Sequence, residues 1–334
     1  MGKQVVIVGG GVAGMQAALS LKARGAEPVI VERGDRLGGK VAGWHKLFPT
    51  FTPVEDVLGP MLRRVQEAGI EVHTGAEVEA LVDGGVVVKG GGRFSGDATV
   101  ICSGFDVFDA RRKEEYGYGI YDNVITTVDL ERMFNEGHVA TVQGTAPHRV
   151  AFLHCVGSRD EKVGAHHCSK VCCITGVKQA IEMKKLFPAA EIYNFYMDIR
   201  MFGPGYEELY RRAQLEYNIN FVRGRISEAS QAMGGKVQIK AEDTLIGRPL
   251  KMTVDMLVLI VGMKGGASNA SYAAGGLVVA DNGFMQPLDP FCGNVLSGKE
   301  GIFYAGAVTA PKNIGDSLNE GSAVADRVAE YLKL

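Results

Sequence analysis

Short apolar runs separated by amphipathic stretches recur along the chain. The runs Val5–Val8 and Pro28–Val31 are rich in β-branched residues, as buried parallel strands are, and residues 13–24 between them have helical periodicity. A return strand is expected within residues 98–110. A second series follows, with strands expected at 148–158, 191–199, 219–224 and 255–264 and helices at about 169–187 and 206–218. This alternation predicts an α/β fold with two parallel-sheet units.

Two helix starts are predicted from capping residues. Thr52 is expected as the N-cap of a helix with Pro53 at its first position, and this helix leads into a small hairpin sheet within residues 70–96. Near the C-terminus, Ile302–Tyr304 is expected as a strand, followed by a helix that Asp316 or Ser317 caps.

The order of these elements predicts two domains. The final strand and helix are expected to rejoin the first unit. The first domain is therefore predicted to be discontinuous, with residues 1–120 and 265–334, and residues 121–264 form an inserted second domain.

Composition narrows the class of protein. The chain has 334 residues, 46% of them hydrophobic and 22% charged, which is enough for two globular domains. A net charge of -2 argues against nucleic-acid binding. No run of eighteen apolar residues occurs, so no membrane span is expected. The N-terminus lacks a secretory cleavage pattern, and we expect a cytoplasmic protein.

A glycine loop follows the first strand. Gly9, Gly11 and Gly14 form G-x-G-x-x-G at the start of a helix, and Glu32 ends the next strand. In such loops the first glycine permits the turn, the second admits a pyrophosphate and the third lets helix and strand pack. The acid lies where a carboxylate binds a ribose hydroxyl. The segment predicts a dinucleotide site in a Rossmann-like unit.

The continuation from Glu32 to Gly38-Gly39 resembles the two-dinucleotide flavoproteins, in which a second glycine turn passes beside FAD. This resemblance implies FAD, and it implies that the C-terminal helix directs its positive end at the flavin. An Asp often follows the glycine of the last strand in such proteins; here Ala307 stands there, and Lys312 or Asn313 is expected to take over its contact. The predicted FAD-binding residues are Gly9, Gly11, Ala13, Gly14, Glu32, Arg33, Gly38, Gly39, Lys40, Gly104, Gly306, Ala307, Lys312 and Asn313.

Four of the six cysteines lie in the second unit, where a second glycine loop would be expected. They are Cys155, Cys168, Cys172 and Cys173, with the spacing C-x12-C-x3-C-C. Four thiolates match a [4Fe–4S] cluster, and adjacent cysteines can reach different irons of one cluster. A zinc site that includes His154, His166 or His167, redox-active or merely buried thiols, and a strained disulfide between Cys172 and Cys173 remain as alternatives. Cys102 and Cys292 are expected to be core thiols.

The segments "CVGSRD", "HCSKVCCITGVK", "GYEELYRRAQ", "FVRGR" and "LIVGM" resemble the A subunits of the heterodisulfide reductases. The resemblance covers nearly the whole chain. It implies FAD, a [4Fe–4S] cluster on the four cysteines, and a lysine near flavin N5 that matches Lys178. The alternative for Lys178 is a solvated helix charge.

Two departures from methanogen-type A subunits are visible. The stretch "KLFPTFTPVEDVLGPM" has no cysteine, and no ferredoxin-like cysteine runs occur. The sequence therefore resembles the compact A subunit of sulfur-oxidising heterodisulfide-reductase-like complexes. The A subunit of the quinone-modifying oxidoreductase is the alternative.

The expected function is that of an electron-transfer oxidoreductase subunit, in which flavin and cluster connect two-electron and one-electron chemistry. The resemblance implies other heterodisulfide-reductase-like subunits as partners, with a lipoate-binding protein as a further candidate, and a homodimer. A pyridine-nucleotide disulfide reductase is disfavoured because no C-x4-C follows the flavin glycine turn. A zinc-stapled FAD scaffold is the non-catalytic alternative.

Overall fold

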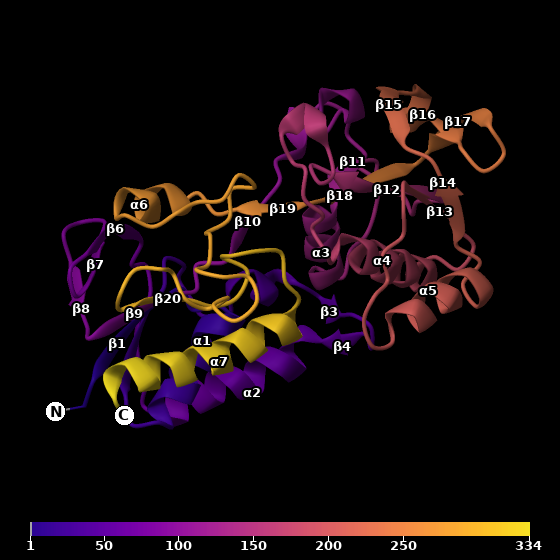
Figure 1. Ribbon diagram of the computed structural model, residues 1–334. Helices are drawn as coiled ribbons and strands as arrows, with labels where there is room; N and C mark the ends of the chain where they lie inside the picture. Colours follow the sequence, from indigo (N-terminus) through magenta and orange to yellow (C-terminus); the bar gives the residue numbers. More distant parts are fainter. Residues whose placement is uncertain (1) are drawn as a thin grey trace. The chain divides into compact units, whose positions relative to one another are not determined.

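The computed structural model describes residues 2–334, which form two compact units (Figure 1). One unit comprises Met1–Gly43, Val54–Asp106 and Lys264–Leu334, and the other comprises Trp44–Pro53 and Val107–Met263. The chain passes between them within β10 (Phe105–Val107) and after residue 263 in β19 (Met263–Gly265).

These boundaries differ from the predicted ones in two places. Residues 107–120 belong to the second unit because Phe108, Ala110 and Tyr116 are buried in its core beside Ala151. The short segment 44–53 belongs there too, since its aromatic residues pack on that unit's other hydrophobic cluster.

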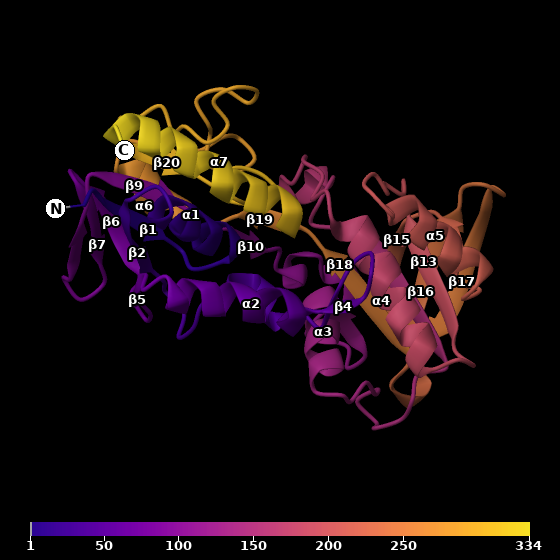
Figure 2. The same cartoon turned by 90° about the horizontal axis from the view of Figure 1, so that it is seen from below.

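The first unit is built on a five-stranded parallel sheet in the order β20-β9-β1-β2-β5. The apolar run in β1 is buried on both faces, as a central parallel strand requires. Helix α1 lies between α2 and α7 (Figure 2). The elements are β1 (Gln4–Val8), α1 (Val12–Lys22), β2 (Glu27–Val31), α2 (Val54–Glu67), β5 (Glu71–His73), β9 (Ala98–Ile101), α6 (Asn269–Ala274), β20 (Ile302–Tyr304) and α7 (Ile314–Leu332).

Helix α7 can approach α1 closely because a glycine faces α1. A Cβ added at Gly321 would lie 2.6 Å from the carbonyl oxygen of Ala13, so any side chain there would push the helices apart. The predicted hairpin region forms a three-stranded antiparallel sheet of β6 (Val78–Val82), β7 (Gly85–Val88) and β8 (Arg93–Ser95).

Both predicted helix caps are wrong. Thr52 and Pro53 form strand β4, which pairs with β3 (Lys46–Leu47), so α2 begins at Val54. Helix α7 is capped by Asn313, whose side-chain oxygen accepts a hydrogen bond from the backbone N–H of Asp316. Asp316 is instead the third helical residue. Its side chain accepts a hydrogen bond from the backbone N–H of Asn313, which completes a capping box.

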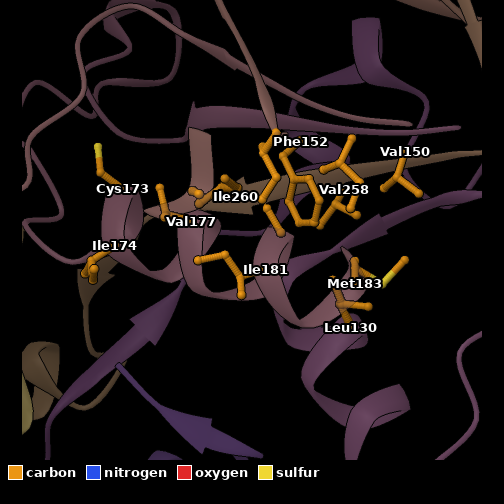
Figure 3. Packing of buried hydrophobic residues seen from close by; sticks show 14 of the residues in the cluster. Leu130, Val150, Phe152, Cys173, Ile174, Val177, Ile181, Met183, Val258 and Ile260 are labelled. Atoms are coloured by element: carbon orange, nitrogen blue, oxygen red, sulfur yellow. The ribbon is translucent and has the colours of Figure 1, made fainter. Parts of the chain in front are cut away.

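The second unit repeats the parallel architecture, with strand order β11-β18-β12-β13-β14. Side chains of α4 pack on this sheet, and Figure 3 shows Val177 of α4 beside Ile260 of β18. The two parallel sheets confirm the predicted fold class. The elements are β11 (Val124–Thr126), α3 (Thr127–Asn135), β12 (Arg149–Val156), α4 (Cys172–Leu186), β13 (Glu191–Tyr196), α5 (Tyr206–Leu215), β14 (Asn220–Arg223), the antiparallel strands β15 (Ile226–Gln231), β16 (Val237–Asp243) and β17 (Arg248–Val254), and β18 (Met256–Val261).

Within residues 2–334, no helix combines the length and the apolar character that crossing a membrane requires.

Candidate functional site

The three glycines of the first loop have different roles. Gly9 has φ +106°, and a Cβ there would lie 2.5 Å from the carbonyl oxygen of Cys102. A Cβ on Gly14 would lie 1.9 Å from the carbonyl oxygen of Gly9. A Cβ on Gly11, by contrast, would meet nothing within 4 Å. Gly9 and Gly14 are therefore required by the fold, whereas Gly11 leaves space open at the start of α1.

This open space lies at a helix end that is suited to an anion. Gly11 is the N-cap of α1 and provides no side-chain hydrogen bond to the first turn. The backbone N–H groups of the first turn therefore have no capping side chain. These N–H groups and the positive end of the helix dipole both lie at the open space beside Gly11. This arrangement fits the pyrophosphate of a dinucleotide.

Glu32 is fixed beside the loop at the end of β2. Its Oε2 accepts a hydrogen bond from Gly10 N at 2.6 Å, and its Oε1 accepts one from Gly34 N at 2.7 Å. The side chain is buried. A carboxylate in this position is held next to the glycine loop, as a ribose-binding acid must be.

The second glycine turn packs against the first loop. Gly38 has φ +109° and its N–H donates to the carbonyl oxygen of Gly10 at 2.8 Å. A Cβ on Gly39 would lie 3.1 Å from the Cα of Gly11. The structure thus brings the two predicted glycine segments together at one place.

Arg33 and Lys40 share a carboxylate that was not predicted from the sequence. Arg33 Nη2 lies 3.8 Å and Lys40 Nζ 4.0 Å from Oδ1 of Asp106. Lys40 also lies over the ring of Phe105, and burial lowers the pKa of its ammonium group although Asp106 acts in the opposite direction. Gly104, with φ +73°, has open space where a Cβ would be.

At the C-terminal glycine the structure shows a second missed acid, Glu320. Gly306 donates its N–H to Glu320 Oε2 at 2.9 Å, and Lys312 Nζ lies 3.0 Å from the same oxygen. Lys312 also donates to the carbonyl oxygen of Gly306 at 2.9 Å. Ala307 is half-buried beside them, and Asn313 serves as the α7 cap. Glu320 therefore positions the backbone and the lysine that were predicted to contact FAD.

The four cysteines of the second unit converge on Cys172. The thiol of Cys172 interacts with the side chains of Cys155, Cys168 and Cys173. Cys155 is the last residue but one of β12 and has φ +61°, a conformation that L residues rarely adopt. The register of β12 against β18 shifts between Leu153 and Val156, so the strand is irregular where it delivers Cys155. Cys172 and Cys173 begin α4.

The surroundings of Cys155, Cys168 and Cys173 lower the pKa of each thiol and so favour the thiolate, the form that binds metals. Interaction with Cys172 lowers the pKa of Cys173 to about 4 and that of Cys168 to about 5. Cys168 also accepts a hydrogen bond from the backbone N–H of Lys170 at 3.4 Å. The interactions with the three other cysteines, together with burial, raise the pKa of Cys172.

Two buried side-chain nitrogens next to the cysteines have no hydrogen-bond partner of the conventional N or O type among the described residues. They are Nδ1 of His154, whose imidazole interacts with Cys173, and Nη1 of Arg159, whose charge acts on Cys155. An unsatisfied buried donor is unfavourable, and an anionic sulfur–metal centre would supply its acceptor. The cysteine group therefore fits an iron–sulfur cluster.

The loop that carries Cys168 is fixed by a buried ion network. Asp160 lies 2.8 Å from Lys113 Nζ and accepts a hydrogen bond from Arg225 Nη2 at 2.7 Å. Ser158 Oγ donates to the carbonyl oxygen of His167 and accepts from Ser169 N. These contacts hold the loop in place, so the fold itself fixes the position of Cys168.

The remaining thiols and the two loop histidines have other surroundings. All six cysteines are free, so no disulfide joins Cys172 and Cys173. Cys102 is buried as predicted, but Cys292 is exposed, and its prediction as a core thiol is wrong. His166 is exposed, and His167 Nε2 contacts the carbonyl oxygen of Met263 at 2.7 Å. Among residues 2–334, no three His, Cys, Asp or Glu side chains are arranged around a single-ion site.

Lys178 is buried, so its interpretation as a solvated charge is wrong. Its ammonium group contacts Oε1 of Glu131, lies 2.9 Å from Glu182 Oε2 and donates to the carbonyl oxygen of Lys46 at 3.0 Å. His45 completes this network, with Nδ1 3.0 Å from Glu182 Oε1. Glu182 is four residues from Lys178 and could have been predicted as its partner, whereas Glu131 comes from α3.

Solved structures with this fold define the class. Thioredoxin reductases of Lactococcus lactis and T. acidophilum each superpose with a TM-score of 0.69, at 16% and 17% identity, and cover 99% of this chain and 100% and 99% of their own. The flavoprotein disulfide reductase RclA of Escherichia coli gives 0.69 at 16% identity, over 97% of this chain and 71% of RclA. Residues 7–57 match the family of NAD(P)-binding Rossmann-like domains. The chain has the fold of a two-domain flavoprotein oxidoreductase.

Sequence relatives identify the branch of this class. The iron-sulfur A subunit of the CoB–CoM heterodisulfide reductase of Methanocaldococcus jannaschii is 33% identical over 98% of this chain and 64% of its own length. The A subunit of the H(2):CoB-CoM heterodisulfide,ferredoxin reductase of Methanothermobacter marburgensis is 30% identical over 98% and 63%. The chain is a homologue of the heterodisulfide reductase A subunits, which confirms the resemblance, and it spans less than two thirds of these relatives' length.

Proposed function

We propose that this chain is an electron-transfer flavoprotein subunit of a heterodisulfide-reductase-like complex, with FAD at the glycine loop and a [4Fe–4S] cluster on Cys155, Cys168, Cys172 and Cys173. The observation that carries the proposal is the convergence of three cysteine side chains on a fourth, Cys172, between β12 and α4. In a Rossmann-like unit this strand-to-helix connection is where a nucleotide's phosphates bind. Here the connection holds thiols instead.

FAD is supported by the first unit. The space at Gly11, the uncapped start of α1 and the fixed carboxylate of Glu32 match the three needs of a dinucleotide: close backbone approach, anion stabilisation and ribose binding. Flavin exchanges electrons in pairs or singly, while the cluster exchanges them singly. The protein's own contribution is to hold both groups and to set their potentials.

Lys178 is the proposed catalytic residue, on the resemblance that places a lysine beside flavin N5. Its burial among Glu131 and Glu182 supports a role that requires a fixed ammonium group. The carboxylates orient the ammonium, and the backbone oxygen of Lys46 takes a further donor position.

The proposed partners are other heterodisulfide-reductase-like subunits, since the relatives are subunits of heterodisulfide reductases. More specifically, the proposed complex acts in sulfur oxidation, includes a lipoate-binding protein and has a homodimer of this chain at its core. This part of the proposal rests on the absence of cysteines from the segment of residues 46–61. Co-purification of the tagged chain with its neighbours in the cell tests it, and isolation with a sulfate-reducing complex would contradict it.

Cofactor content tests the main proposal. Protein purified without oxygen should contain about one FAD, about four iron and about four sulfide per chain. Its spectrum should show the broad absorbance of an iron–sulfur cluster that overlaps the flavin bands. A dithionite-reduced sample should give the electron paramagnetic resonance of a reduced cluster. Zinc in place of iron, or loss of FAD from a fully folded protein, would contradict the proposal.

A further inference from the structure

We propose that His154 positions the ligand Cys173 and raises the reduction potential of the cysteine-bound centre by donating an N–H···S hydrogen bond from Nδ1. This inference rests on the proposed [4Fe–4S] cluster. His154 itself is not a ligand in this proposal, and its effect passes through the sulfur of Cys173.

The imidazole is held rigidly between strand and helix. His154 is 2% exposed and lies on β12 next to the irregularity at Cys155. A Cβ added at Gly176 of α4 would lie 2.9 Å from His154 Cε1. The absence of a side chain at Gly176 therefore lets the helix lie directly against the ring, which leaves the ring little freedom.

The two ring nitrogens have different surroundings. Nε2 lies 2.9 Å from Oδ1 of Asn194, which is fully buried. Nδ1 has no conventional hydrogen-bond partner among residues 2–334, and the imidazole's other polar interaction is with the side chain of Cys173. When Cys173 is a metal-bound thiolate, its sulfur is the acceptor that Nδ1 requires.

Asn194 can determine which ring nitrogen carries the proton. Its Nδ2 also has no partner in the described part of the chain. If the amide is turned end for end, Nδ2 donates to Nε2 of His154, and a neutral imidazole then carries its proton on Nδ1. Rotation of the Asn194 amide thus gives Asn194 Nδ2 an acceptor and gives His154 Nδ1 the proton that it donates.

Hydrogen bonds to cluster sulfurs stabilise the reduced state more than the oxidised state, because the reduced centre has more negative charge. Removal of the Nδ1 donor should therefore make the potential more negative. The backbone donors to the cysteine sulfurs, such as Lys170 N to Cys168, do not change in such a variant.

Two amide variants separate the nitrogens. In His154→Asn the side-chain nitrogen can take the place of Nδ1, whereas in His154→Gln it can take the place of Nε2. Potentiometric titration followed by electron paramagnetic resonance should show a more negative midpoint for His154→Gln and a midpoint close to wild type for His154→Asn, at equal iron and sulfide content. Equal midpoints in all three proteins, or equal shifts in both variants, would overturn the inference.

A measurement on the wild type covers the case in which the variants lose the cluster. Pulsed proton spectroscopy before and after exchange into D2O should detect an exchangeable proton coupled to the reduced cluster that 15N-labelled histidine identifies as imidazole. Absence of any histidine coupling would overturn the inference. A wild-type protein without iron and sulfide would instead contradict the proposed function, so the two failures are distinguishable.

Discussion

Lys178 and Glu182 lie one turn apart on α4 and form an ion pair of 2.9 Å between Nζ and Oε2. Both side chains are almost fully buried, at 2% and 5% exposure, and Glu131 is the second carboxylate on the same ammonium group. Lys178 is therefore the cation of a buried ion network within its own unit.

The first prediction follows from this burial. Lys178→Ala leaves the carboxylates of Glu131 and Glu182 without their cation and should lower the free energy of unfolding by about 3–5 kcal/mol. Chemical denaturation measures the loss. Lys185→Ala, which removes a lysine of the last turn of the same helix, is the matched control and should cost far less. Equal costs would show that the buried pair adds no stability.

The second prediction separates the roles of two glycines. Gly11→Val should abolish FAD binding yet leave the protein folded, because a Cβ there meets nothing within 4 Å of the protein. Gly14→Ala should instead impair folding, since its Cβ would lie 1.9 Å from the carbonyl oxygen of Gly9. Flavin content and circular dichroism of both variants decide the matter. A fully flavinated Gly11→Val protein would refute the placement of the site.

The third prediction concerns the acid at the end of β2. Glu32→Ala should weaken FAD binding by about 1.5–3 kcal/mol, the value of a hydrogen bond to a charged group. Fluorescence titration of the apoprotein with FAD measures this change. Glu27→Ala, at the exposed start of the same strand, should leave affinity unchanged. Similar losses in both variants would mean that the effect is not specific to the site.

The fourth prediction uses pH. Lys113 and Arg225 hold the pKa of Asp160 below its usual 3.8 against the opposing effect of burial. A carboxyl group with a lowered folded-state pKa stabilises the protein at pH values above its unfolded-state pKa, and this stabilisation is lost as the pH falls towards the folded-state value. Asp160→Asn should therefore be less stable than wild type at pH 7, and the difference should shrink below about pH 4. A difference that stays constant with pH would contradict this account.

The alternation of strands and helices was predictable because β-branched runs and helical periodicity are local properties. Ile302–Tyr304 is a strand over the predicted residues. The start of α2 was not predictable from Pro53, because that residue is recruited into a strand pair with Lys46. The boundary after residue 106 depends on the core contacts of Phe108 and Tyr116, which no local pattern reveals.

The candidate site was predictable to a similar degree. The cysteine spacing indicated which sulfurs would meet, and His154 was considered only as a zinc ligand, so its interaction with Cys173 was not predicted. Regular alternation along β12 places His154 and Cys155 on opposite faces, and the irregular backbone at Cys155 breaks that rule. The pairing of Glu131 with Lys178 joins residues from two helices and likewise depends on tertiary packing.

The central claim, a cluster held by the four converging cysteines, is tested most directly by Mössbauer spectroscopy of protein grown on 57Fe. Wild type and Cys292→Ser, which changes an exposed thiol, should give the spectrum of a [4Fe–4S] centre with full iron content. Cys172→Ala should lose the cluster while FAD stays bound, since the glycine loop belongs to the other unit. A Cys172→Ala protein that keeps a full [4Fe–4S] spectrum, or a wild type without one, would contradict the account.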